Sequence, residues 1–481
     1  MSWSAAQIVE ALQGSDPALA VLAPQLDMIM ASGGDALIWP NAISRRTSFG
    51  TTTRPAAHEI WFSSTSAQSI SRPAWDETLR TLSRLMRKNP SPLSMSEWFD
   101  DIRARIAQNF SATTCSVLLM PSAAEARDTA RAIALLLLKR DLFEIATTPS
   151  ECANFSESAR PEIRTLIVDM RAATGDPREQ SDIDADAVEL CEAALESGQG
   201  VFFQLLDTSK TGLTGISRGA ARSVAQVAPG RTLALVDASE GRTYANEVRR
   251  DLAQGMMVLV SGSQFVGGPP HCAALLLPDS VADALTGIND ASGILPAMAR
   301  FDAPRELRYL FAGVETAVAN PGLGLRWSAA LAEHDEYFRV SDALRRDILE
   351  TFARKARAIA ARCGFLTVEA LLPDHTEDPL RESIVALIPL TPARSPKAMQ
   401  YAEAIRIALA QPCPGLTGDA ICHIGHAIPV ADRAALPIAA SAQMVNDVAR
   451  RMAHGLSFDR ATTPVLRDLE TLFRKWEALA G

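Results

Sequence analysis

The chain has 481 residues, enough for more than one domain, and its 47% hydrophobic and 21% charged content is typical of a globular protein with a large core. Its net charge of -9 argues against a nucleic-acid partner, because neutralising phosphates requires clustered lysine and arginine. No apolar run approaches the roughly 20 residues that cross a bilayer. The seven scattered cysteines include no Cys-x-x-Cys pair, so they indicate neither a disulfide framework nor a metal site.

The start of the chain predicts a cytoplasmic location without a membrane partner. Residues 1–10 lack the basic start and the apolar core of a secretion signal. Residues 1–60 then predict an irregular arm that contains Gly33 and Pro40. After the arm, apolar residues at helical spacing predict one helix from Pro73 onward and another over residues 95–110.

Strands and helices alternate over the next part of the chain. The predicted strands cover residues 116–120, 164–169, 200–206 and 232–237, and the predicted helices cover residues 124–139, 186–197 and 217–227. Continuous apolar strands that alternate with helices indicate a parallel sheet covered on both faces. We therefore expect an α/β large domain with a mostly parallel sheet over residues 61–310.

The alternation weakens after Pro278, and residues 311–481 predict a smaller α+β domain. A long helical region over residues 324–361 leads into it. Its other predicted elements are strands over residues 364–371, 383–390 and 421–430 and helices over residues 442–454 and 463–479. Cys422, His423 and His426 fall within one predicted strand, where alternation separates side-chain directions, so a structural role is favoured over a metal site.

Two segments of the large domain carry residues suited to chemistry. Asp237 ends an apolar strand, and Gln264 lies in the segment Ser-Gly-Ser-Gln-Phe-Val-Gly-Gly-Pro over residues 261–269. Together they resemble the class V aminotransferase and cysteine desulfurase branch of the fold type I pyridoxal-phosphate (PLP) enzymes, in which a strand ending in Asp precedes a Ser-x-x-Lys-Phe-x-Gly-Pro-like stretch. The resemblance implies a fold type I PLP-transferase-like large domain followed by a smaller domain.

The resemblance places Gln264 at the position of the catalytic lysine. That lysine forms a Schiff base with the cofactor aldehyde and shuttles a proton, whereas a glutamine amide is neither nucleophilic nor basic. Lys210 lies in the turn over residues 208–212, which matches an Asn-x-x-Gly turn of the desulfurases. We expect this amine beside the pocket, either as a substitute for the lysine or as an ordinary solvated side chain.

The resemblance also implies a set of cofactor contacts. Asp237 matches the carboxylate that pairs with the pyridine nitrogen, although a strand-end Asp also caps helices. Ser122 and Ala123 match the Ser-Gly-Thr phosphate cup at a helix N-terminus, and Ser122 is also a simple helix cap. Ser209 matches the donor to the ring hydroxyl. Two further serines, Ser261 and Ser263, precede the lysine position.

Several expected groups are replaced at the same pocket. Ala123 and Ala124 stand for the Gly and Thr of the phosphate cup, Ser263 stands where many of these enzymes carry His, and Pro437 stands where an Arg often binds the substrate carboxylate. Independent losses at one pocket favour relaxed catalysis. They also make a standard α-amino acid a less suitable substrate.

Three functional hypotheses follow. The first is a non-catalytic protein that forms a homodimer, or that completes the dimer-interface site of an active, related subunit. The second is an enzyme that binds PLP without a lysine and acts on an amine-containing small molecule by transamination, elimination or decarboxylation. The third is an ordinary PLP enzyme in which Gln264 replaces a natural lysine by engineering. Retention of PLP depends chiefly on Asp237.

Overall fold

The structure is a computed structural model, and it describes residues 22–87, 91–112, 114–152, 158–289, 291, 293–311, 319–369, 378–390 and 398–480. The described chain begins with helix α3 (Ala23–Met30) and the 3-10 turn η1 (Ala36–Ile38), so the arm expected to be irregular contains a short helix. Helices α4 (Arg72–Arg87) and α5 (Pro92–Asn109) follow where apolar spacing predicts them. No helix of the described residues is long and apolar enough to cross a membrane.

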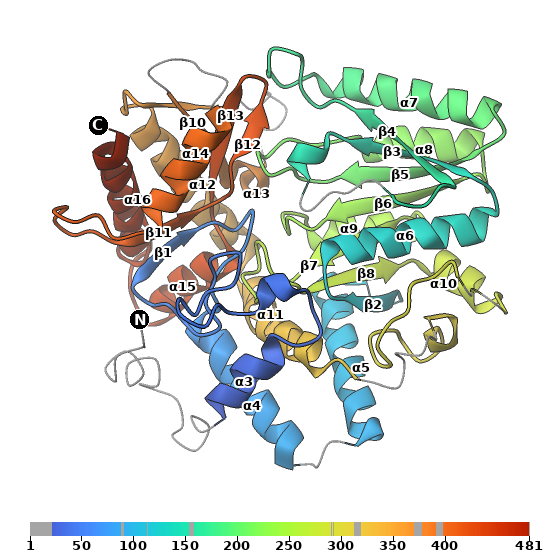
Figure 1. The fold of residues 1–481 in the computed structure, drawn as a ribbon, viewed down its shortest axis with the longest axis horizontal. Helices are drawn as coiled ribbons and strands as arrows, with labels where there is room; N and C mark the ends of the chain where they lie inside the picture. The colour runs from blue at the N-terminus through green and yellow to red at the C-terminus, as the bar shows by residue number, and fades with distance from the viewer. Residues whose placement is uncertain are drawn as a thin grey trace.

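A seven-stranded sheet forms the centre of the larger half of the molecule (Figure 1). In chain order its strands are β2 (Ser116–Met120), β3 (Leu142–Thr147), β4 (Ile163–Val168), β5 (Gly200–Leu206), β6 (Thr232–Ala238), β7 (Met257–Ser261) and β8 (Ala273–Leu277). In space their order is β2-β8-β7-β6-β5-β3-β4, and β8 runs antiparallel to both of its neighbours. The expected mostly parallel sheet is confirmed.

Helices cover both faces of this sheet. Helices α6 (Ala123–Leu138) and α10 (Asp279–Thr286) pack on one face. The other face is covered by α5, α7 (Gln180–Glu196), α8 (Arg218–Val227), α9 (Ala245–Ala253) and α11 (Pro321–Arg339). Along β6, Leu233 and Leu235 pack toward α6, whereas Val236 and Ala238 pack toward the opposite layer. Since side chains alternate along a strand, Asp237 faces α6.

The smaller half is an α+β unit, as expected. An antiparallel sheet has the order β12-β13-β10-β9, formed by β9 (Leu366–Val368), β10 (Ile384–Pro389), β12 (Ile428–Val430) and β13 (Arg433–Ala439). Strand β1 (Glu59–Phe62) pairs in parallel with β11 (Ile421–Ile424), so the start of the chain joins this half. The helices here are α12 (Asp342–Ala360), α13 (Pro379–Glu382), α14 (Ala398–Leu409), α15 (Ala442–Ala453) and α16 (Phe458–Ala480).

Two predicted elements are each divided in the structure. The strand predicted over residues 421–430 is β11 and β12, which belong to different sheets. The chain turns at Gly425, where an added Cβ would lie 2.5 Å from atoms of Thr65 and Pro437. The long helical region is α11 and α12, because Ser341 has an extended backbone and its hydroxyl caps α12 at the Leu344 amide.

Strand β3 lies outside the predicted strands because a charged residue interrupts its apolar run. Glu144 occupies the middle of β3 and is fully buried. Its carboxylate accepts hydrogen bonds from Nε and Nη2 of Arg131 on α6, at 2.8 and 3.1 Å, and from the Thr165 hydroxyl at 2.8 Å. The carboxylate is thus paired across the layer, which makes its burial tolerable.

We expect Phe203→Ala to destabilise the protein by about 3–5 kcal/mol, since it empties the space of a buried aromatic ring in the middle of β5. Urea unfolding followed by tryptophan fluorescence measures the change. Val227→Ala, at a side chain that is 81% exposed, is the control and should change stability by less than about 0.5 kcal/mol. Equal effects of the two substitutions would contradict the packing described here.

Candidate functional site

A cavity of about 320 Å³ lies where the carboxyl ends of the central strands meet the smaller half. Of the residues selected from the sequence, Ser122, Ala123, Lys210, Ser261, Ser263 and Gln264 all line it. Thr65 contributes from the segment after β1, His426 from the segment after β11, and His271 from the segment before β8. The structure therefore brings six of the eight selected residues to one place, while Asp237 and Ser209 are not among the lining residues.

One wall of the cavity is the N-terminus of α6. The Ser122 hydroxyl accepts a hydrogen bond from the Glu125 amide at 3.2 Å, and the Ser122 carbonyl accepts one from Ala126 at 3.1 Å. Ser122 is thus the helix cap, and it also faces the cavity together with Ala123. The positive end of the helix dipole suits an anion at this wall.

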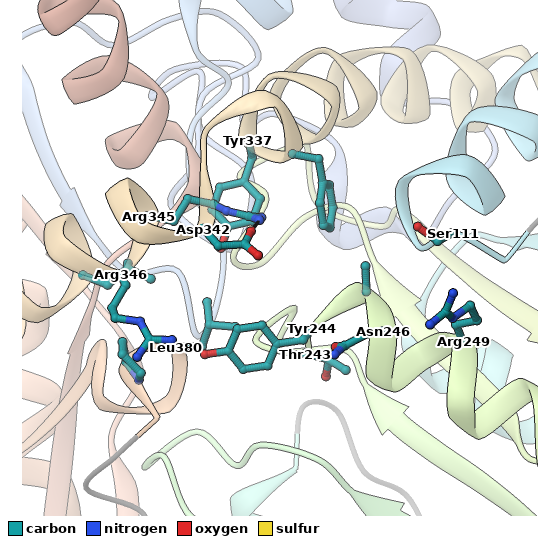
Figure 2. Close-up of a pocket in the computed structure, with 14 residues that line it drawn as sticks. Ser111, Thr243, Tyr244, Asn246, Arg249, Tyr337, Asp342, Arg345, Arg346 and Leu380 are labelled. Atoms are coloured by element: carbon teal, nitrogen blue, oxygen red, sulfur yellow. Dashed lines mark hydrogen bonds and ion pairs between the residues drawn. The ribbon is translucent and has the colours of Figure 1, made fainter.

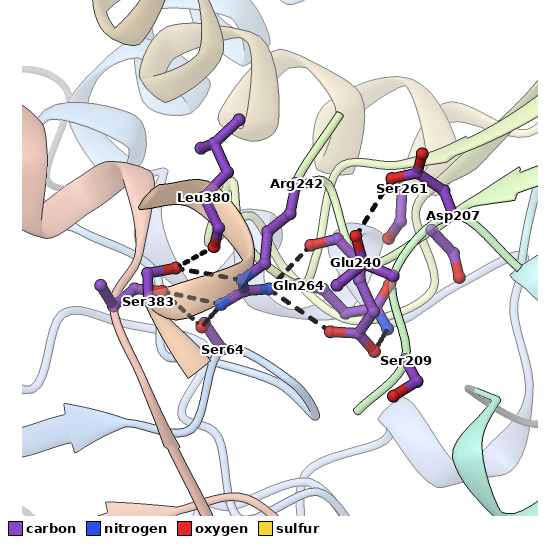
Figure 3. Close-up of polar contacts among 12 residues, drawn as sticks. Ser64, Asp207, Ser209, Glu240, Arg242, Ser261, Gln264, Leu380 and Ser383 are labelled. Carbon is purple, nitrogen blue, oxygen red and sulfur yellow. Dashed lines mark hydrogen bonds and ion pairs between the residues drawn. The ribbon is translucent and has the colours of Figure 1, made fainter. Parts of the chain in front are cut away.

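Gln264 is held by a buried carboxyl group, as Figure 3 shows. Its amide Nε2 donates a hydrogen bond of 3.0 Å to Oε1 of Glu240, and both side chains are buried. Burial raises the pKa of Glu240 to about 8, although Arg242 and Lys210 act in the opposite direction. The amide can orient or donate a hydrogen bond, but it offers no nucleophile or base at the position where the sequence resemblance expects a lysine.

Arg242 fixes the loop that carries Glu240 against the smaller half (Figure 3). Its guanidinium donates to the Ser64 hydroxyl at 2.7 Å, to the Ala440 carbonyl at 3.0 Å and to the Ser383 hydroxyl at 3.3 Å. These partners adjoin β1, β13 and β10, respectively. One buried side chain therefore joins the loop after β6 to both sheets of the smaller half.

Asp237 forms a buried ion pair with Arg127. Nε of Arg127 donates to Oδ2 of Asp237 at 2.8 Å, and the side chains are 1% and 0% exposed. The other carboxylate oxygen accepts a hydrogen bond from the Ser239 amide at 3.1 Å. Arg127 lies on the sheet-facing side of α6, the same layer that Asp237 faces. Both carboxylate oxygens are therefore engaged within the protein.

Ser209 and Lys210 are neighbours in the chain with different surroundings. The Ser209 hydroxyl is buried and accepts hydrogen bonds from the amides of Thr211 and Leu213 at 3.2 and 3.1 Å, so it stabilises the turn. Lys210 faces the cavity, and no hydrogen bond or ion pair joins its amine to another residue in the described part of the chain. Its positive charge opposes the rise that burial causes in the pKa of Glu240, and it adds to the lowering that burial causes in the pKa of His426.

Ser261 and Ser263 form a small hydroxyl pair on the cavity wall. Their hydroxyl oxygens are 2.9 Å apart, and the Ser261 hydroxyl also accepts a hydrogen bond from the Ser263 amide at 3.1 Å. Two other cavity residues have polar atoms that lack a partner within the described part of the chain. The hydroxyl of Thr65 and Nδ1 of His271 have no hydrogen-bond partner among the described residues, although both atoms are buried. These polar atoms can bind a small ligand or ordered water.

The histidines and cysteines form no metal site in the described ranges, where no group of three or more His, Cys, Asp or Glu could hold an ion. His423 stacks on Trp61 with ring centroids 3.7 Å apart, and its Nε2 lies 2.8 Å from a Glu59 carboxylate oxygen. His426 instead lines the cavity. The two histidines thus have separate surroundings.

Sequence reasoning missed Arg127, Glu240 and Arg242. A signal exists for the first of these: Arg127 and Arg131 are spaced i, i+4 on the alanine-rich helix, on the face that also carries Ala134. A charged residue on a buried helix face needs a partner, and here the partners are Asp237 and Glu144. Glu240 and Arg242 follow a strand end, and the sequence carries no comparable signal for them.

No family model matches the sequence, and no curated protein matches it. Solved structures do match. A NifS-like protein covers 88% of this chain and 99% of its own, with a TM-score of 0.55 and 10% identity. Mouse CSAD in apo form covers 88% and 84%, with a TM-score of 0.54 and 12% identity.

Two further matches have TM-scores of 0.50. The apo cysteine desulfurase from Thermococcus onnurineus NA1 is 11% identical and covers 83% of this chain and 95% of its own. A lysine-to-alanine mutant of C-DES, with glycine covalently linked to its PLP cofactor, is 12% identical and covers 86% and 96%. The chain has the fold of the fold type I PLP enzymes. At these identities the likeness concerns the fold alone, and the fold implied by the sequence resemblance is confirmed.

The cavity does not fit PLP held in the manner that the resemblance implies. Gln264 cannot form the covalent link, and Asp237 has both carboxylate oxygens engaged outside the cavity wall. Ser209 uses its hydroxyl within its own turn. Only the α6 terminus with Ser122 fits one part of the cofactor, its phosphate.

We expect the Glu240 carboxyl to make stability fall as the pH rises. Its pKa is about 8 in the folded protein and near the ordinary 4.5 when unfolded, so the folded state binds more protons between these values. The contribution of the protonated Glu240 carboxyl to the free energy of unfolding is therefore present in full below about pH 4.5 and is lost as the pH rises through about 8. The stability advantage of the natural protein over Glu240→Gln should shrink between pH 5 and pH 8 by an amount on the order of a few kcal/mol.

Urea unfolding of both proteins at the two pH values measures this change. Glu196→Gln, at an exposed position on α7, is the matched control and should leave the pH dependence of the natural protein intact. A difference between the natural protein and Glu240→Gln that stays constant with pH would show that Glu240 is ionised throughout.

Proposed function

We propose that this protein is a non-catalytic member of the fold type I architecture, acting in the cytoplasm as a homodimer or as the partner subunit of an active, related protein. One observation carries the proposal. Asp237 is paired with Arg127 outside the cavity wall, and Gln264 stands on that wall where the resemblance expects the lysine, so two independent requirements of PLP chemistry are unmet. The fold persists because neither change disturbs the sheet.

The Arg127–Asp237 pair is the stronger of the two obstacles. A pyridine nitrogen would have to share or displace the guanidinium of Arg127, whose Nε donates to Oδ2 of Asp237 at 2.8 Å. Separating a buried ion pair leaves an uncompensated charge, which costs on the order of 3–5 kcal/mol. A restored lysine at position 264 would not remove this cost. The pair therefore also argues against Gln264 being a lone engineered replacement in an otherwise ordinary enzyme.

A second candidate function is a PLP enzyme that works without a lysine at position 264 on an amine-containing small molecule. The observation that favours it is the position of Lys210, whose amine faces the same cavity without a partner among the described residues. The cavity volume of about 320 Å³ accommodates a small molecule. We rank this candidate second because Asp237 would have to leave its ion pair with Arg127 in order to contact a cofactor.

We expect titration of the purified protein with PLP to give no saturable absorbance change and, after borohydride reduction, no cofactor adduct on any cavity residue. Gln264→Lys alone should behave in the same way, because Asp237 remains paired with Arg127. Absorbance spectra and peptide mapping of the reduced protein are the measurements. Lys210→Gln is the control for a reaction at the remaining cavity amine.

Two outcomes of this titration would overturn the proposal in different ways. An adduct mapped to Lys210 in the natural protein, and abolished in Lys210→Gln, would establish the second candidate. A saturable change that appears only with Gln264→Lys would show that the pocket still accepts the cofactor, as expected of an engineered replacement. Residue 264 would then be the sole obstacle.

We expect the purified protein to form a homodimer with twice its mass of 51.6 kDa. Proteins with this fold are typically dimers, and the arm, which also carries the cavity residue Phe49, exposes large apolar side chains at Trp39 and Ile43. Size-exclusion chromatography with light scattering measures the mass, and Trp39→Asp with Ile43→Asp should shift it toward the monomer. Val227→Asp, exposed on α8, should leave it unchanged. A monomeric natural protein would leave only the partner-subunit form of the proposal.

A further inference from the structure

A second cavity, of about 340 Å³, lies between the two halves of the molecule (Figure 2). The start of α9 forms one side of it, and the end of α11, the start of α12 and α13 form the others. It shares no lining residue with the first cavity. Phe265 follows Gln264 of the first cavity in the chain, and its ring packs edge-on against the lining residue Tyr337 of the second, with centroids 5.2 Å apart.

The wall of this second cavity carries an excess of positive charge. Arg249, Arg345 and Arg346 line it, with Asp342 as the one acidic lining residue. Arg345 is paired with Asp342. No hydrogen bond or ion pair joins the guanidinium of Arg249 or Arg346 to another residue in the described ranges. In a chain of net charge -9, such a group of arginines differs from the average surface and favours an anion.

Flat apolar surfaces accompany the arginines. The Arg345 guanidinium lies over the rings of Tyr337 and Phe338, at 4.6 and 5.3 Å from their centroids. The Tyr244 ring lines the cavity and is partly exposed, and its hydroxyl donates to Oδ1 of Asp378 at 3.1 Å. Figure 2 shows this ring between Arg346 and Arg249 at the border of the open space. A ligand with a flat apolar body can contact Tyr244 while its charge meets an arginine.

The wall is held in place by buried contacts across the two halves. Asp207, which follows β5, is 2.8 Å from Arg218 on α8 and 3.6 Å from Arg381 on α13, and it also accepts a hydrogen bond from the lining residue Thr243. These opposite charges hold the pKa of Asp207 below its usual value despite burial. The two sides are thus joined before any ligand arrives, which reduces the entropy lost on binding.

We propose that this cavity binds a small organic anion with a flat apolar body. Its carboxylate or phosphate group meets Arg346, its body lies against Tyr244, and Arg249 on the opposite wall adds attraction for negative charge. The site is distinct from the cavity that holds Gln264, so its existence does not depend on the proposed function. Guanidinium groups bind planar carboxylates and phosphates in this way because their donors form a rigid fork.

Isothermal titration calorimetry of the full-length protein with phenyl phosphate tests the proposal. Comparison with benzoate shows whether the site prefers a carboxylate or a phosphate. Inorganic phosphate has the charged group without the ring, and phenol has the ring without the charged group. We expect saturable binding of phenyl phosphate or benzoate at one site per chain, and binding of inorganic phosphate and phenol that is at least about tenfold weaker.

Three substitutions test the residues. Arg346→Gln and Arg249→Gln should each weaken binding by about threefold to thirtyfold, and Tyr244→Ala should remove the preference for the ring-bearing anion over inorganic phosphate. Arg460→Gln, an exposed arginine on α16, is the matched control for the lost charge and should bind like the natural protein. Circular dichroism spectra confirm folding of each variant.

Three results would overturn the proposal. In the first, neither phenyl phosphate nor benzoate binds. In the second, inorganic phosphate binds as tightly as phenyl phosphate. In the third, Arg346→Gln and Arg249→Gln weaken binding no more than the control Arg460→Gln does. The last result would reflect only the overall charge of the chain. None of these ligands is PLP, so a negative result in these titrations does not contradict the proposed function. Likewise, the result of the PLP titration does not test this second cavity.

Discussion

The pairing of two arginines on α6 with two carboxylates of the central sheet is the interaction on which the rest of the structure depends. Arg127 meets Asp237 on β6, and Arg131 meets Glu144 on β3, with all four side chains buried. A buried charge without a partner is strongly destabilising, so each pair fixes the position of the helix over the sheet. The same contacts that hold the layers together also engage Asp237, the carboxylate that the sequence resemblance assigns to the PLP ring nitrogen.

A second constraint joins the two halves at the carboxyl ends of the strands. Arg242 reaches from the loop after β6 to residues beside β1, β10 and β13, and Asp207 connects β5 with α13 through Arg381. Both cavities lie at this junction. Where two layers meet, side chains from separate parts of the chain converge, and this explains why both candidate binding sites lie there.

The first cavity combines a fold suited to a cofactor with residues that do not fit the cofactor. The α6 terminus with Ser122 still favours an anion, and the cavity is lined by Thr65 and His271, which each have a buried polar atom without a hydrogen-bond partner among the described residues. By contrast, the amide of Gln264 donates its hydrogen bond to Glu240. Such a cavity supports binding more readily than group transfer, because binding needs donors whereas transfer also needs a nucleophile or base.

Local patterns determined much of the fold. The strands at residues 116–120 and 200–206 have the predicted bounds, because each is a largely apolar run without a charged residue. Where a buried charge interrupts the run, as Glu144 does in β3, the pattern fails, since only the arrangement of layers supplies Arg131 as its partner. The division of residues 421–430 into two strands likewise depends on the close approach of Gly425 to Pro437 and Thr65.

The candidate site divides in the same way. By itself the sequence determined that residue 264 offers no amine, and it selected six residues that share one cavity, because strand ends and helix starts meet at one edge of a parallel sheet. Only the tertiary structure decided what Asp237 does, because its partner Arg127 is 110 residues away in the chain and reaches it across two layers. The arginine cavity between the halves was also decided by packing alone, since Arg249 and Arg346 share no local pattern.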